Sequence, residues 1–157
     1  MEPVINEEKI TTIHSNKLGE ELKEEDYLVI SLDYSKKFNK HFYYNLIDKA
    51  RQANVHLVYF FSRAEKHLKH FKLAKISKKI EKHLKASSLN YCIFRVNESY
   101  QNFLQFNKHT KETKQVQFYV DPDSSISFVD ENDIPDVFLA TVLHVPPKHA
   151  SSYFRII

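Results

Sequence analysis

The chain has 157 residues, which is long enough for one domain with a continuous hydrophobic core. Hydrophobic residues make up 42% of it and charged residues 27%, which excludes wholesale disorder, a collagen-like fibre and a coiled-coil rod. No apolar run approaches the roughly 18 residues needed to cross a bilayer. The single cysteine, Cys92, excludes an intrachain disulfide, and the acidic start differs from a signal peptide. We therefore expect a cytoplasmic protein.

Acidic residues dominate the first 26 positions, where eight acids and three lysines leave a local charge of −5. Apolar residues are sparse there. We interpret residues 1–26 as an acidic N-terminal arm that either solvates the protein or contacts a basic surface, and residues 27–157 as a single α/β domain.

Strand patterns alternate with helix patterns in the first part of this domain. The strand patterns are continuous apolar runs, which favour strands buried on both faces, at 27–32, 55–61 and 90–96. Apolar residues at three- and four-residue spacing predict a helix over 37–53. The sequence Ser62-Arg-Ala-Glu65 has the form of a capping box, which predicts that a second helix begins there, and a short third helix is expected within 97–108.

The pattern changes after residue 114. Residues 115–120 alternate between polar and apolar, and 126–129 follow a turn-rich loop, which predicts an antiparallel hairpin. The stretch Asp133-Ile-Pro-Asp136 suits the first turn of a helix ending near His144, although a strand over 137–145 is the alternative. Residues 152–157 are predicted to form an edge strand.

The alternation as a whole is typical of a three-layer, doubly wound, flavodoxin- or Rossmann-like α/β fold with a mostly parallel sheet. The sequence contains one glycine, Gly19, where average usage of about 7% would give roughly 11. Glycine-rich phosphate cradles, dinucleotide-binding turns and nucleophile elbows are therefore absent. Biased coding composition and a functional cause are both open explanations.

Two strand-to-helix turns, at Val29-Ile-Ser-Leu-Asp-Tyr-Ser35 and Phe94-Arg-Val-Asn-Glu-Ser-Tyr100, resemble the first and third such turns of Toll/interleukin-receptor-type signalling domains. The glycine-containing loop that follows the second strand in that family is absent here. The resemblance implies the α/β fold class, draws attention to Asp33 and Glu98, and assigns no catalytic residue.

A basic segment is the clearest charge feature, because nine basic and two acidic residues give residues 63–85 a local charge of +7. Five of its lysines project opposite an apolar stripe and are candidate partner- or anion-binding residues: Lys75, Lys78, Lys79, Lys82 and Lys85. Such a face binds phosphates or an acidic protein surface, and it is also what an ordinary solvated helix presents.

A second candidate site consists of carboxylates. Asp33 follows the first strand, at the edge where parallel sheets bind ligands, and Asp121 and Asp123 follow a later one. Converging carboxylates would hold a divalent metal and serve a nuclease or phosphoesterase. The simpler interpretation makes Asp33 or Ser35 a helix N-cap and places the other two aspartates in a turn.

Charge segregation leads to the functional hypothesis of a non-catalytic regulatory or effector-type protein that acts by association, through the basic helix and the acidic arm. Its expected partner is a protein, either another protein or a second copy of this chain, and it needs no cofactor. The alternatives are the metal-dependent nuclease or phosphoesterase, with a divalent metal, and a non-specific nucleic-acid binder. His67 and His70, at helical spacing, are interpreted as solvated, so no metal ligands are assigned.

Overall fold

The computed structural model describes residues 22–24, 26–32, 39–64, 72–101, 111, 114, 127–144 and 152–156. Within these ranges the elements follow in the order β1 (Tyr27–Ser31), α1 (Lys40–Gln52), β2 (Leu57–Arg63), α2 (Lys72–Ala86), β3 (Tyr91–Val96), β4 (Glu98–Ser99), β5 (Phe128–Val129), α5 (Asp133–His144) and β6 (Ser152–Ile156).

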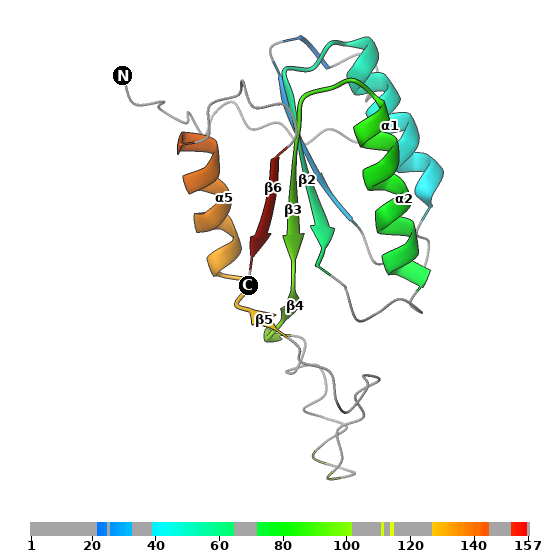
Figure 1. The fold of residues 1–157 in the computed structure, drawn as a ribbon. Helices are drawn as coiled ribbons and strands as arrows, with labels where there is room; N and C mark the ends of the chain where they lie inside the picture. The colour runs from blue at the N-terminus through cyan, green and yellow to red at the C-terminus, as the bar shows by residue number, and fades with distance from the viewer. Residues whose placement is uncertain are drawn as a thin grey trace.

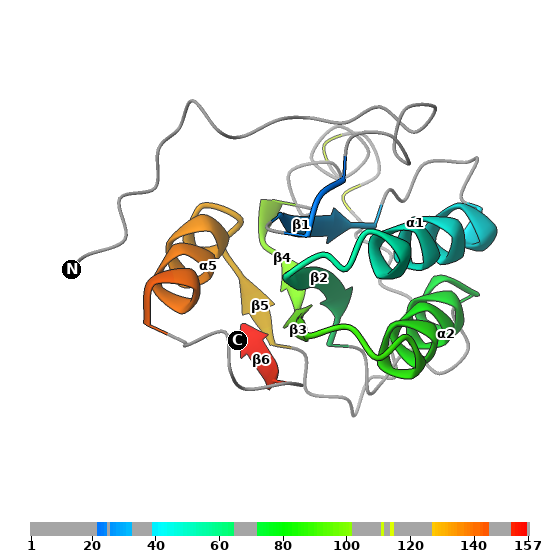
Figure 2. The same ribbon diagram turned by 90° about the horizontal axis from the view of Figure 1, so that it is seen from above.

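Four of these strands form one parallel sheet in the order β1-β2-β3-β6. The short strands β4 and β5 form a second, two-stranded parallel sheet. Helices α1 and α2 lie on one face of the main sheet and α5 lies on the other, as Figure 1 and the view from above in Figure 2 show. The predicted three-layer α/β fold with a parallel sheet is confirmed.

One hydrophobic core joins α1 and α2 to the sheet. Ile47 on α1 and Ile80 and Leu84 on α2 are fully buried against Phe60 and Ile93 of the two central strands. The helical spacing of apolar residues therefore marks the buried faces of both helices. Leu22, from the predicted acidic arm, also packs against this core; residues 1–21 lie outside the described residues, so the arm itself stays a prediction.

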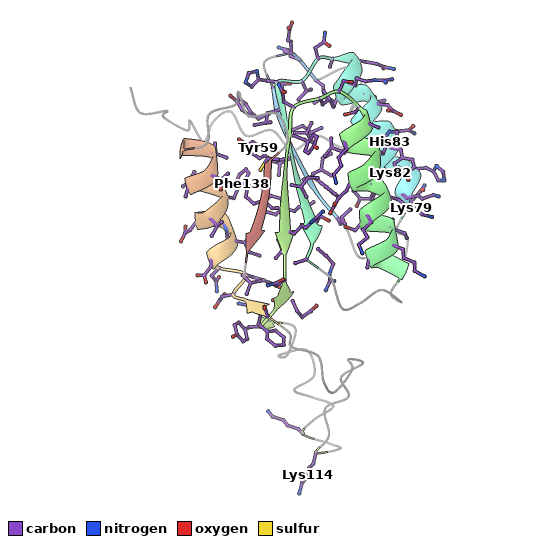
Figure 3. All side chains as sticks on the ribbon, in the orientation of Figure 1. Tyr59, Lys79, Lys82, His83, Lys114 and Phe138 are labelled. Atoms are coloured by element: carbon purple, nitrogen blue, oxygen red, sulfur yellow. The ribbon has the colours of Figure 1, made fainter. Side chains whose placement is uncertain are left out.

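A second core lies under α5. Side chains alternate along a strand, so Tyr59 and Phe94 point to the face opposite the first core. Phe138 of α5 contacts Tyr59 edge to face, with ring centroids 5.1 Å apart, and Figure 3 shows these two residues facing one another. This aromatic contact anchors α5 to the sheet.

The burial of β1 and the N-cap of α1 differ from what the sequence predicts. Strand β1 is an edge strand and not buried on both faces, because Tyr27 and Val29 are 54% and 50% exposed. The N-cap of α1 is Asn39, whose side chain accepts a hydrogen bond from the His41 N–H, so Asp33 or Ser35 does not cap this helix. A continuous apolar run thus does not distinguish an edge strand from a central one.

The capping-box prediction was also wrong. Ser62 lies inside β2, where a buried serine needs a hydrogen-bond partner, and α2 begins at Lys72. The apolar spacing within α2 still marks its buried face correctly.

Near the carboxyl terminus, the predicted helix from Asp133 to His144 is confirmed as α5, and the alternative strand over 137–145 is wrong. The edge strand is confirmed as β6, parallel to β3. The antiparallel hairpin is not confirmed, because β5 pairs in parallel with β4 and residues 115–126 lie outside the described residues. Among the helices that the structure describes, none is long and apolar enough to span a membrane.

Candidate nucleotide-binding edge of the sheet

The carboxyl ends of the parallel strands meet at one edge of the sheet, where open α/β folds bind their ligands. Strand β2 ends at Arg63, which is in register with Val96 at the end of the neighbouring strand β3. The chain then continues through Asn97 into β4, which lies below β3 in Figure 1. The polar residue that ends β2 and the polar residues that follow β3 therefore lie at the same edge of the sheet.

An ion pair closes this edge. The Arg63 Nη2 donates a hydrogen bond to the Glu98 Oε2, joining the end of β2 to β4. Both side chains are roughly one quarter exposed, so the pair borders solvent. A guanidinium in this position suits a phosphate or carboxylate, because its fork of N–H donors matches their oxygens.

Asn97, between these two elements, carries an unsatisfied donor. Its Nδ2 is buried, and within the described part of the chain it has no hydrogen-bond acceptor. Such groups are rare in folded proteins because losing water without gaining a partner costs free energy.

A hydrogen-bonded turn holds the two short strands together. The Ser99 hydroxyl donates to the Gln101 Oε1 over 2.9 Å, and the Gln101 Nε2 donates to the Asp130 Oδ1 over 2.6 Å. The backbone N–H of Asn132, followed by the Gln101 amide, keeps the pKa of Asp130 below its usual value. This network fixes where β4 ends and where α5 begins.

An aromatic pair lies beside that turn. Tyr100 donates its backbone N–H to the Val129 carbonyl, and its ring stacks on Phe128 with centroids 5.3 Å apart at 27°. Tyr100 is 56% exposed. The chain thus presents a flat aromatic surface at the carboxyl edge.

On the other side of β2 lies a buried polar network that the sequence analysis missed. Ser62 donates to the Glu81 Oε1 over 2.6 Å and therefore accepts the hydroxyl proton of Ser77, also at 2.6 Å. Arg95 donates hydrogen bonds to both carboxylate oxygens of Glu81, from Nε to Oε1 over 3.2 Å and from Nη2 to Oε2 over 2.7 Å. One sequence feature could have indicated this network: Ser77 and Glu81 are four residues apart, about one helical turn, and lie close to the apolar stripe of α2.

The five predicted lysines all lie on α2 and all are exposed, opposite the buried stripe. Lys79 and Lys82 point away from the sheet in Figure 3. Exposure alone is what any solvated helix face shows, so an anion- or partner-binding role for these lysines stays a prediction.

Asp33, Asp121 and Asp123 lie outside the described residues, so their predicted convergence is not tested. In the part of the chain that the structure describes, no group of three or more His, Cys, Asp or Glu side chains could hold a metal ion.

These elements form a Rossmann-like α/β fold with a parallel sheet. No protein-family model matches the sequence, and no curated protein matches it. Among solved structures, the chain is similar to a nucleoside-diphosphate-sugar epimerase from Staphylococcus aureus, with a TM-score of 0.74 and 17% identity over 98% of this chain and 60% of that one.

Two further structures share the fold. MoeE5, solved in complex with UDP-glucose and NAD, has a TM-score of 0.67 and 15% identity over 88% of this chain and 58% of its own. The NADPH-dependent quinone oxidoreductase of Escherichia coli, solved with NADPH, has a TM-score of 0.55 and 20% identity over 64% of this chain and 36% of its own. The chain therefore spans 60% or less of the length of these three proteins.

These similarities contradict the functional hypothesis drawn from charge. The structures that share this fold include a nucleoside-diphosphate-sugar epimerase and an NADPH-dependent quinone oxidoreductase, which speaks against a regulatory association protein, a metal-dependent nuclease or a nucleic-acid binder. The physical reason for the error is that charge segregation does not report function. A lysine-rich helix face arises wherever a helix needs a solvated side, and it says nothing about the chemistry at the strand ends.

Proposed function

We propose that the chain acts as the nucleotide-binding part of an epimerase- or oxidoreductase-like protein, with its ligand at the carboxyl edge of the parallel sheet. The buried, unsatisfied Nδ2 of Asn97 carries the proposal, because it needs an acceptor that a ligand oxygen would supply. The neighbouring Arg63 guanidinium suits the phosphate of such a ligand. The similar structures solved with UDP-glucose, NAD or NADPH support the same ligand class.

A complete dinucleotide fits this chain poorly. Rossmann-like proteins cradle the pyrophosphate of a dinucleotide in a turn with the pattern G-x-G-x-x-G, where the glycines allow close approach of the backbone. The sequence has one glycine, Gly19, and none after β1. We therefore assign to its edge residues the binding of a nucleoside diphosphate or its sugar ester, and no hydride-transfer step.

The test is calorimetric titration of the chain with UDP, UDP-glucose and NAD. We expect UDP and UDP-glucose to bind more tightly than NAD, because the dinucleotide lacks its glycine cradle. Replacing Asn97 with alanine should weaken UDP binding by roughly 2- to 10-fold, the equivalent of one hydrogen bond.

Asn90 is the matched control, because it lies just before β3, at the opposite end of the strand, and its exposed amide donates to the His56 carbonyl. Asn90→Ala should leave binding unchanged. The proposal fails if the wild-type chain binds none of the three ligands, and the role of Asn97 fails if the two variants bind UDP equally well.

A further inference from the structure

The exposed ring of Tyr100 is the feature of this edge that the polar contacts leave unexplained. A large aromatic side chain normally gains stability by leaving water, yet Tyr100 is 56% exposed as a residue while its ring stacks on Phe128. An aromatic ring that is open on one face and supported on the other is suited to stacking a third flat ring.

The backbone around this ring is held in place. Tyr100 is bound to β5 through its N–H and the Val129 carbonyl, 3.0 Å apart. On its carboxyl side, the Gln101 N–H donates to the Ser99 hydroxyl, also over 3.0 Å, and the Gln101 amide reaches Asp130. Because these bonds exist before a ligand arrives, little conformational freedom is lost when one binds.

The position of the ring matches that of the ion pair. Tyr100 directly follows β4, and the first residue of that strand, Glu98, is paired with Arg63. A ligand that contacts both features must combine a flat ring with an anionic group a few bonds away. A nucleoside phosphate has this composition.

We infer that Tyr100, supported by Phe128, is a stacking platform for the base of the nucleotide, while Arg63 faces its phosphate. This inference rests on the proposed function and deepens it by naming the base as the part recognised through stacking. It also offers a means of holding a nucleotide that needs no glycine-rich turn, in a chain whose single glycine precedes the sheet.

The experiment compares two ligands by calorimetry: UDP, which has a base, and ribose 5-phosphate, which has none. Tyr100→Ala should weaken UDP binding by about 5- to 150-fold, the range for loss of one base–aromatic stack, and leave ribose 5-phosphate binding unchanged. Tyr100→Phe keeps the ring and should bind UDP within about two-fold of the wild type.

Tyr27→Ala is the matched control, because Tyr27 is also exposed, at 54%, and also stacks on a neighbour, Tyr59, but lies at the amino end of β1. It should bind UDP as the wild type does. Far-ultraviolet circular dichroism of each variant checks that it is folded.

Each outcome has a separate meaning. UDP binding that is lost in Tyr100→Ala and kept in Tyr100→Phe supports the platform. If wild type and Tyr100→Ala bind UDP equally well, the platform is wrong and the proposed function stands. If Tyr100→Ala loses binding of both UDP and ribose 5-phosphate, the ring maintains the local structure of the carboxyl edge and does not stack on the base, so the platform is wrong. If the wild type binds no nucleotide, the proposed function fails and the platform with it.

Discussion

Glu81 shows how one residue can connect three elements of this fold. Its carboxylate is buried on α2, accepts the Ser62 hydroxyl of β2 and pairs with the Arg95 guanidinium of β3. A buried carboxylate costs free energy unless its oxygens are hydrogen-bonded, and here each oxygen has a partner. The network therefore fixes the position of α2 along the two central strands, directly behind the carboxyl edge.

Replacing Glu81 with alanine should lower the free energy of unfolding by about 2 to 4 kcal/mol, because it leaves a buried hydroxyl and a guanidinium without their acceptor. The guanidinium reaches solvent, which keeps the loss below that of a fully buried pair. Urea unfolding measures the change. Lys82→Ala, one residue along the helix and exposed, should stay within about 0.5 kcal/mol of the wild type. Equal stability of the two variants would show that the network contributes nothing.

Among the elements, α5 packs on the sheet through an aromatic side chain, Phe138, together with Ile134, Val137 and Val142. Phe138 contacts three rings of the sheet, with centroids 5.1 Å from Tyr59, 5.5 Å from Phe61 and 5.7 Å from Phe94. The helix also leads from β5 towards β6, so its attachment connects the small sheet to the main one (Figure 1).

Phe138→Ala should lower the free energy of unfolding by about 2 to 3 kcal/mol, somewhat less than for a fully buried phenylalanine, because this ring is only partly buried. The next residue provides the control: Leu139 is 42% exposed, and Leu139→Ala should have little effect. Denaturant unfolding of both variants is the measurement. A loss confined to Leu139→Ala would mean that α5 is held by its other face.

The elements also show which parts of the fold are readable from sequence. Helix α5 was predicted with its bounds because its signals, an acidic first turn and a proline near its start, are local. The pairing of Glu98–Ser99 with Phe128–Val129 was not, because 126–129 was assigned to an antiparallel hairpin with 115–120, whereas its parallel partner lies far away in the chain. Long-range pairing of short strands leaves no local trace.

The candidate site, too, could be predicted only where its signals are local in the sequence. Arg63 was interpreted as part of a helix cap because the pattern Ser62-Arg-Ala-Glu65 satisfies the local rule, while tertiary structure continues β2 through Ser62 and Arg63. The ion pair of Arg63 with Glu98 spans 35 residues, so only the register of β2 against β3 brings it together. The edge could be predicted from the parallel sheet, whereas the residues that line it required the structure.

At the scale of the whole molecule, the chain joins a familiar fold to an unusual composition. Rossmann-like proteins use glycine where the backbone meets a phosphate, and this chain has no glycine within its sheet. A shared fold defines where ligands bind, and the side chains at that place define which ligands they are. The ring of Tyr100 and the charge of Arg63 are therefore more informative about the ligand than the similarity of the fold.

The whole molecule should also lose stability in alkaline solution. Burial raises the pKa of the Cys92 thiol from its ordinary 9.0 to about 11, and burial, followed by the neighbouring Cys92 and Tyr27, raises the pKa of Tyr59 from 10.0 to about 12. Above about pH 9 the unfolded chain releases these protons while the folded chain keeps them. Because the unfolded state then binds fewer protons, the free energy of unfolding falls as the pH rises, through the window from about 9 to 12.

Urea unfolding at a series of pH values measures this fall, and Cys92→Ala removes the contribution of the thiol together with its effect on the pKa of Tyr59. The variant has no thiol to ionise in either state, so its stability should decline less steeply than that of the wild type between about pH 9 and 11. The remaining decline, from Tyr59, should begin about one pH unit higher, because the ordinary pKa of a tyrosine is 10.0. Parallel declines in the two proteins would show that the Cys92 thiol does not cause the alkaline sensitivity.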